Sequence, residues 1–182
     1  KAVERAARVA DGFLFGDCQY STDIDRESSD HPGVFSCYRP VADDTPIEEG
    51  RKLSEDDWAR LYVLGRTDKK QAFAVYSDHY LKTNGQIYWS DLHQVAGQLD
   101  VRNLQEALVQ HAGQRERGSE MITELYVKRD NLVPFLRAAR KDILDHKIDL
   151  TYGTIRFIER DDESFLAWAK EQSVCVLCNL HV

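Results

Sequence analysis

The stretch from Leu150 to Val182 constrains the fold more than any other part of the chain. It reads as a strand over Leu150–Glu159, a charged turn, a short helix over Ser164–Lys170 and a last strand that ends at Val182. Both strands alternate with a period of two residues, as strands do when their two faces lie in different surroundings. We therefore expect this unit to form the sheet around which the rest of the chain is organised.

Polar side chains interrupt both of these apolar strands. Alternation places Leu150, Tyr152, Thr154, Arg156 and Ile158 on one side of the first strand, and Cys175, Leu177, Asn179 and His181 on one side of the last. A cation, an imidazole, an amide and a hydroxyl thus fall on neighbouring strands that are otherwise built for burial. We interpret this pair of strands as the best candidate wall of an active site.

Arg156 is the sharpest of these signals, because an arginine in an apolar strand has to be paired or to face a cavity. Two interpretations stay open. Arg156 either forms an internal salt bridge with Glu124 or Glu159, or it is a fixed positive charge that binds an anionic substrate or stabilises developing negative charge. Two interpretations also stay open for His181, since a lone histidine in a strand is either a hydrogen-bonded core residue or an acid/base group.

The chain before this unit predicts further strands and helices. Strands are expected over Gly12–Thr22 and over Met121–Lys128, where Ile122, Glu124 and Tyr126 share a face. A helix capped by Asp130 is expected over Asn131–His146, and helices are expected from Ser54 and after Asp68. The fold class predicted is α+β, with a mostly antiparallel sheet and helices packed on one face.

Two segments stand apart from this pattern. Residues from about 23 to 53 are polar and read as a loop insertion, with a strand-like island at Val34–Pro40. The segment Gln86–His93 is short and aromatic, and its Tyr88 suits a ligand pocket or plain core packing.

Composition excludes several functional classes. The 182 residues fit one domain, and the net charge of −7 argues against a general nucleic-acid-binding protein. No apolar run is long enough to span a membrane, and four cysteines in no framework pattern favour a reduced, cytoplasmic setting. Cys175 and Cys178 point to opposite faces of a strand, so we read them as buried small hydrophobic residues.

Cofactor motifs are missing from the sequence. It contains no G-x-G-x-x-G, no P-loop and no H-E-x-x-H, so no cofactor cradle is recognisable. The chain also begins and ends inside predicted secondary structure, at Lys1 and Val182. We therefore expect a fragment of a larger protein.

Several segments together resemble one enzyme family. DGFLFGDCQYSTD, GVFSCYRPV, GQIYWSDLHQ, EMITELYVKRDNLVPFL and TYGTIRFIERDDESFLAW…NLHV, in this order, resemble the substrate (cap) domain of FAD-linked oxidoreductases of the vanillyl-alcohol-oxidase type, which include the aldonolactone and alditol oxidases. The resemblance runs through most of the chain and is strongest from Met121 to Val182. It implies a ferredoxin-like cap domain whose FAD-binding domain belongs to the same parent chain and is absent here.

The resemblance also implies roles for individual residues. Alditol oxidases contact the polyol through a Glu-x-Arg pair on a cap strand, and Thr154-Ile155-Arg156 occupies the matching place. The arginine is kept and the acid is replaced by Thr154, so a polyol substrate does not follow directly. Arg156 would polarise or orient the substrate oxygen. His181 would either assist removal of the hydroxyl proton as hydride leaves for the flavin or orient the substrate.

The full prediction is an FAD-dependent oxidase or dehydrogenase that acts on an alcohol, polyol or lactone-type small molecule. Its catalytic residues would be Arg156 and His181, with Thr154, Asn179, Glu124 and Tyr88 binding substrate. The fragment alone would be inactive, because the cofactor cradle lies elsewhere. The alternative prediction is a non-catalytic α+β interaction domain in which Arg156 and Glu124 form a buried ion pair.

Overall fold

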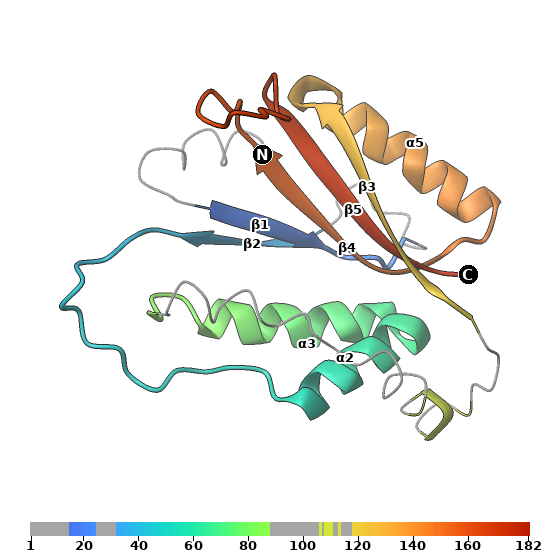
Figure 1. Cartoon of the computed structure of the whole chain (residues 1–182). Helices are drawn as coiled ribbons and strands as arrows, with labels where there is room; N and C mark the ends of the chain where they lie inside the picture. Colours follow the sequence, from blue (N-terminus) through green and yellow to red (C-terminus); the bar gives the residue numbers. More distant parts are fainter. Residues whose placement is uncertain (1–14, 25–31, 88–105, 107, 111–112, 114–117) are drawn as a thin grey trace. The chain divides into compact units, whose positions relative to one another are not determined.

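The computed structural model describes residues 15–24, 32–87, 106, 108–110, 113 and 118–182. The chain forms two compact units, one made of Lys1–Val41 with Glu120–Val182 and the other of Ala42–Ser119. The described residues of the first unit include a five-stranded antiparallel sheet and an α-helix, and those of the second include a pair of α-helices (Figure 1). The predicted α+β class and antiparallel sheet are confirmed.

The sheet has the strand order β2-β1-β4-β5-β3. Its strands are β1 (Phe15–Tyr20), β2 (Gly33–Tyr38), β3 (Glu120–Lys128), β4 (Asp149–Ile158) and β5 (Ser173–His181). All neighbouring strands are antiparallel. The two strands predicted near the C-terminus are β4 and β5, and they lie between the other strands. The strand-like island within the polar segment is β2.

One face of this sheet, called the core face below, is covered by helix α5 (Leu132–Asp145) (Figure 1). The helix connects β3 to β4, which run parallel with β5 between them. Leu132 packs with Ile155, Val174 and Val176 in one buried cluster. Burying each such side chain contributes about 1.5–3 kcal/mol, so this cluster fixes which face of β4 and β5 points inward.

On the core face, the ring of Tyr20 from β1 lies over Gly153 of β4. A Cβ atom placed on Gly153 would lie 2.1 Å from the ring and the hydroxyl oxygen of Tyr20, so the ring occupies the space of the missing side chain. The Tyr20 hydroxyl reaches the Cys178 sulfur on β5 at 3.6 Å. Burial raises the pKa of Tyr20, so its phenol stays neutral in the core. Gly153 thus allows one ring to connect three strands.

A bulge in β4 changes one predicted orientation. The pairing of β4 with β5 shifts between Leu150 and Tyr152, so that Leu150 pairs with Leu180 and Tyr152 with Asn179. The extra residue moves Leu150 to the core face, where it is buried. The expectation that Leu150 shares a side with Tyr152 is therefore wrong, and it holds only from Tyr152 onward.

Two local predictions near the sheet are also wrong. Ser164–Lys170 forms no helix but turns and irregular backbone. The Asp161 carboxylate accepts hydrogen bonds from the backbone N–H groups of Glu163 and Ser164, and such local bonds compete with a helix that would be only two turns long. Asp130 does not cap α5 either, because it lies in a 3₁₀ turn, η2 (Arg129–Asn131), that precedes the helix.

The second unit contains the helices α2 (Glu55–Thr67) and α3 (Lys69–Lys82), which pack on each other. Ser54 caps α2 as predicted, and its side chain and that of Asp57 form a reciprocal capping box. The Asp68 side chain accepts the Gln71 backbone N–H at the start of α3. Within the part of the chain that the structure describes, no helix is long and apolar enough to cross a bilayer.

Candidate functional site

The face of the sheet opposite α5 carries the polar residues of β4 and β5 and is called the polar face. Residues that are Cα partners in adjacent strands project to the same side, and Thr154 pairs with Leu177 whereas Arg156 pairs with Cys175. Asn179 and His181 continue the alternation of Leu177 along β5. Arg156, Thr154, Asn179 and His181 therefore lie along one diagonal line, the polar track, as their predicted alternation requires.

The middle of the polar track holds two buried polar atoms that lack a hydrogen-bond partner. Thr154 is 8% exposed and Asn179 is 6% exposed. Neither the Thr154 Oγ1 atom nor the Asn179 Oδ1 atom has a partner. Because leaving a buried polar group unpaired costs about 1–3 kcal/mol, two such groups in diagonal positions on neighbouring strands are unusual in a plain structural sheet.

One end of the polar track is Arg156, and it is exposed. The predicted ion pair with Glu124 is absent from the described ion pairs: the Glu124 carboxylate is exposed and accepts a 2.8 Å hydrogen bond from the Tyr126 hydroxyl. Register explains this, since Glu124 is the partner of Leu177, whereas Arg156 is the partner of Cys175 on the other side of β5. The buried Arg–Glu pair of the alternative prediction is therefore wrong.

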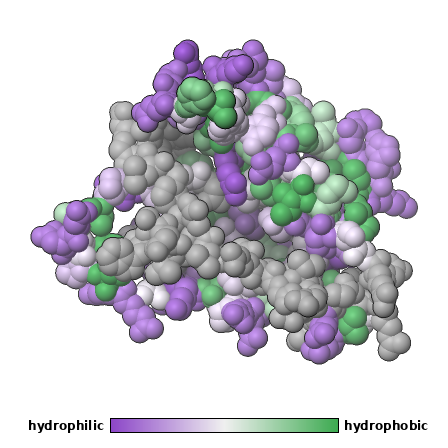
Figure 2. Space-filling view, in the orientation of Figure 1, coloured by the Kyte–Doolittle hydropathy of each residue, from purple (hydrophilic) through white to green (hydrophobic). Residues whose placement is uncertain are grey.

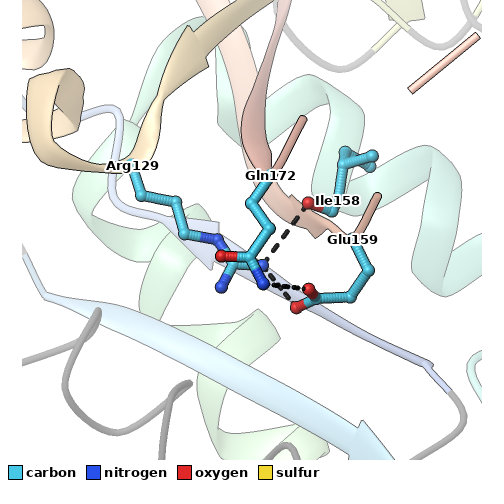
Figure 3. Close-up of polar contacts among 4 residues, drawn as sticks. All are labelled: Arg129, Ile158, Glu159 and Gln172. Carbon is cyan, nitrogen blue, oxygen red and sulfur yellow. Dashed lines mark hydrogen bonds and ion pairs between the residues drawn. The ribbon is translucent and has the colours of Figure 1, made fainter. Parts of the chain in front are cut away.

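Glu159, the other acid considered for Arg156, belongs to a different cluster (Figure 3). Its carboxylate forms an ion pair with Arg129 and accepts a hydrogen bond from Gln172 at 2.6 Å. The hydrogen bond from Arg129 lowers the pKa of Glu159. Arg129 also contacts the carbonyl oxygen of Ile158. This cluster ties the end of β3 to both ends of the β4–β5 connection, so its role is structural.

The other end of the polar track is His181, which forms a dyad with an acid that sequence reasoning missed. The Nδ1 atom of His181 lies 2.7 Å from the Oε1 atom of Glu120 on β3, and the two side chains are only 14% and 13% exposed. Glu120 and His181 are Cα partners, and Asp149 is the partner of His181 on β4. Glu120 is the first residue of β3 and belongs to no local motif, so only the strand register identifies it.

The structure does not bring the two predicted catalytic residues together. Arg156 pairs with Cys175, and Cys175 and His181 are six residues apart on β5. At about 3.3 Å per residue, this places the two backbone positions roughly 20 Å apart. Arg156 and His181 therefore share a face without forming one cluster, and the buried pair Thr154 and Asn179 lies between them.

Large apolar side chains border the polar track on the β3 side. Ile122, the Cα partner of Asn179, is exposed, and so are Tyr126, the partner of Cys175, and Trp168. The Tyr126 and Trp168 rings meet edge to face at 5.4 Å. Trp168 belongs to the β4–β5 connection, whose Phe165 is 100% exposed. Figure 2 shows hydrophobic residues among hydrophilic ones at the end of the molecule where this connection lies.

The cysteines on β5 do not form a reactive pair. Cys175 lies on the polar face and Cys178 on the core face, as the strand period predicts, and both thiols are free. Burial raises the pKa of the Cys175 thiol, which keeps it protonated. Among the described residues, no group of three or more His, Cys, Asp or Glu side chains could hold a metal ion.

The remaining predicted residue, Tyr88, lies outside the described residues. Of the others, Thr154, Arg156, Asn179 and His181 form the polar track, and Glu124 lies on the same face at its exposed β3 margin.

Comparison with known proteins returns no match, either among protein-family models or among curated proteins and solved structures.

Proposed function

We propose that this chain is the substrate-binding (cap) domain of an FAD-dependent oxidoreductase, which oxidises an alcohol, polyol or lactone-type substrate by hydride transfer to flavin. The observation that carries the proposal is the pair of buried, unpartnered polar atoms, Thr154 Oγ1 and Asn179 Oδ1, on one face of two neighbouring strands. Such atoms are expected where a ligand supplies the missing hydrogen bonds.

The chemistry of the two groups favours an uncharged hydroxylated ligand. A threonine hydroxyl both donates and accepts, and an asparagine carboxamide presents an acceptor and two donors. A substrate hydroxyl can donate to the Asn179 Oδ1 atom and accept from the Thr154 hydroxyl. Arg156, at the exposed end of the polar track, is suited to a more distant substrate oxygen.

The exposed apolar residues beside the polar track favour a protein in which another domain covers this face of the sheet. Ile122, Tyr126 and Trp168 are large, exposed and adjacent to the polar track, and clustered exposed apolar side chains commonly mark interaction sites. In the proposed protein, the FAD-binding domain of the same parent chain would lie over this border and enclose the substrate. Enclosure would also exclude water from the reacting atoms.

The residues present fit the substrate side of such a site and not the cofactor phosphates. The sequence has no glycine-rich phosphate-binding loop, so a separate domain would hold FAD. Bound flavin would supply the two-electron oxidation. The contribution of this chain would be to bind and orient the substrate through Thr154, Asn179 and Arg156, and to accept a proton at His181.

The alternative, a non-catalytic interaction domain, depended on a buried Arg156–Glu124 pair, and that pair is absent. Four further parts of the proposal rest on the resemblance or on composition: the FAD-binding partner domain, the cytoplasmic location, the inactivity of this part alone and the absence of nucleic-acid binding.

The test uses the longer protein of which we take this chain to be a part, called the parent protein below. It is purified, its visible spectrum is recorded for bound flavin, and it is mixed anaerobically with polyols, simple alcohols and aldonolactones. We expect the protein to contain bound flavin. One of these three substrate classes should reduce the flavin, seen as loss of its visible absorbance, and the other two should reduce it more weakly. A parent protein without flavin, or flavin that none of them reduces, would overturn the proposal.

A further inference from the structure

The Glu120–His181 dyad has the geometry of a positioned base. The two residues face each other across β3 and β5, and the Nδ1–Oε1 distance of 2.7 Å is that of a charge-assisted hydrogen bond. Both side chains are largely buried, so water competes little for either partner. Two strands of one rigid sheet supply the pair, which is more precise than placement on a loop.

This hydrogen bond sets the protonation of the imidazole ring. An ionised carboxylate can only accept, so the Nδ1 atom must carry the hydrogen that it donates to Glu120. In a neutral ring, the Nε2 atom is then left with its lone pair and can take up a proton. Asp149 is the group that faces His181 from the strand on its other side, so each neighbouring strand places an acid at this register.

A ligand-binding group lies next to the dyad on the same strand. Asn179 is two residues before His181, so it projects to the same face about 7 Å away along β5. Its buried Oδ1 atom is one of the two unpartnered acceptors of the polar track. A substrate hydroxyl held by Asn179 would therefore lie closer to His181 than to Arg156, which is at the far end.

We propose that Glu120 is a positioning residue, which holds His181 as the base for the substrate hydroxyl. This inference rests on the proposed function and deepens it. The O–H proton of the substrate passes to the Nε2 atom of His181. The neighbouring C–H bond breaks with its electron pair, which leaves as hydride for the flavin, and the carbon–oxygen bond becomes a carbonyl. The substrate is thus oxidised by two electrons while the flavin is reduced.

Substrate binding by Arg156 and proton removal by His181 thus take place at different positions along the polar track. Proton removal belongs to the His181 end, and Arg156 serves substrate binding only. Removing the Glu120 carboxylate should therefore reduce the rate of the chemical step and leave substrate affinity nearly unchanged, because in this proposal Glu120 acts through His181 and does not itself reach the substrate.

The experiment compares Glu120→Ala, Glu120→Gln and Glu120→Asp in the parent protein, with Glu171→Gln as the control. Glu171 is an exposed acid that pairs with Lys128 at the opposite end of β3, far from the dyad. Anaerobic flavin reduction gives the rate constant and the half-saturating substrate concentration, and nitrogen NMR of histidine-labelled protein gives the tautomer of His181.

We expect Glu120→Ala to slow flavin reduction about 100-fold, as at the upper end of the losses seen when a group that orients a metal-bound histidine is removed. The half-saturating substrate concentration should change less than about twofold. Glu120→Asp should recover part of the rate, and Glu171→Gln should match the wild type. In the tautomer spectrum, the Nδ1–H form should dominate in the wild type and be lost in Glu120→Ala.

Two results would overturn the inference. The first is a Glu120→Ala protein that reduces flavin at the wild-type rate, which would leave the proposed function intact. The second is a wild-type His181 tautomer with its hydrogen on Nε2, which would show that Glu120 does not set the ring. If the wild type reduces no flavin at all, the proposed function fails instead, and the tautomer measurement still decides whether Glu120 positions His181.

Discussion

Arg156 and His181 project from the same face of one sheet, yet they lie far apart along it. Cys175, the partner of Arg156 on β5, is six residues from His181. That separation of roughly 20 Å means that the two side chains cannot act on one bond of a small substrate. The buried, unpartnered Thr154 and Asn179 lie between them. In the proposed oxidoreductase, proton removal is therefore the task of the His181 end of the polar track, and Arg156 at the other end contributes to substrate binding only.

This separation predicts that the effects of substitutions at the two ends add. Residues more than about 10 Å apart without shared partners usually have effects that add within about 0.5 kcal/mol. Arg156→Met and His181→Gln should each lower kcat/KM of the parent protein, and the double variant should show the product of the two losses. A double variant that is no slower than the worse single variant would mean that the two side chains act as one unit.

The unpartnered hydroxyl of Thr154 predicts a substitution that stabilises the unliganded protein. Thr154→Val keeps the shape and removes a buried group without a partner, so the free energy of unfolding should rise by about 1 kcal/mol. Thr22 is the matched control, because its buried hydroxyl donates to the Thr151 carbonyl at 3.4 Å. Thr22→Val should not stabilise. Urea unfolding measures both, and a Thr154→Val protein less stable than the wild type would contradict the account.

The Tyr20 ring above Gly153 predicts strong coupling between these two positions. Gly153→Ala would place a Cβ atom 2.1 Å from the ring, so the variant should lose about 1–3 kcal/mol of stability through overpacking. In a Tyr20→Leu background the obstruction is smaller, and the same alanine should cost less. Thermal unfolding of the four proteins in this cycle measures the coupling. An equal cost in both backgrounds would show that the ring does not occupy this space.

The Arg129–Glu159 ion pair predicts a pH dependence on the acid side. The pKa of Glu159 is lowered in the folded protein, so the pair stabilises the fold above the ordinary value of about 4.5 and this contribution is lost as the pH falls further. Glu159→Gln should therefore reduce stability near neutral pH and make little difference in strong acid. Glu171→Gln removes an exposed pair and should have almost no effect at any pH. Unfolding curves of the three proteins across this range provide the test.

The sequence predicts the sheet well because its strands follow a strict two-residue period. The faces of β3 and β5 are as the alternation requires, and so is the face of β4 from Tyr152 to Ile158. The exception is Leu150, because a bulge adds one residue and reverses the order of faces. The bulge has no sequence signature here, since neither a glycine nor a proline lies between Leu150 and Tyr152.

The site was only partly predictable for a related reason. Which residues share a face follows from alternation within a strand, but which residues meet across strands depends on register, and register is a tertiary property. Glu124, one of the two acids considered as a partner for Arg156, does not pair with it, whereas Glu120 meets His181 without any local signal. The helix expected at Ser164–Lys170 failed because the turn made by Asp161 supplies local hydrogen bonds that a two-turn helix cannot outweigh.

The most direct test of the central claim is the dependence of flavin reduction on substrate concentration in the parent protein, compared between the wild type and Asn179→Leu. We expect the flavin content to be equal in both proteins. The half-saturating substrate concentration should be about tenfold higher in the variant, as expected when a hydrogen bond worth about 1.4 kcal/mol is lost. An equal half-saturating substrate concentration in both proteins would contradict the claim that the substrate lies on the polar track.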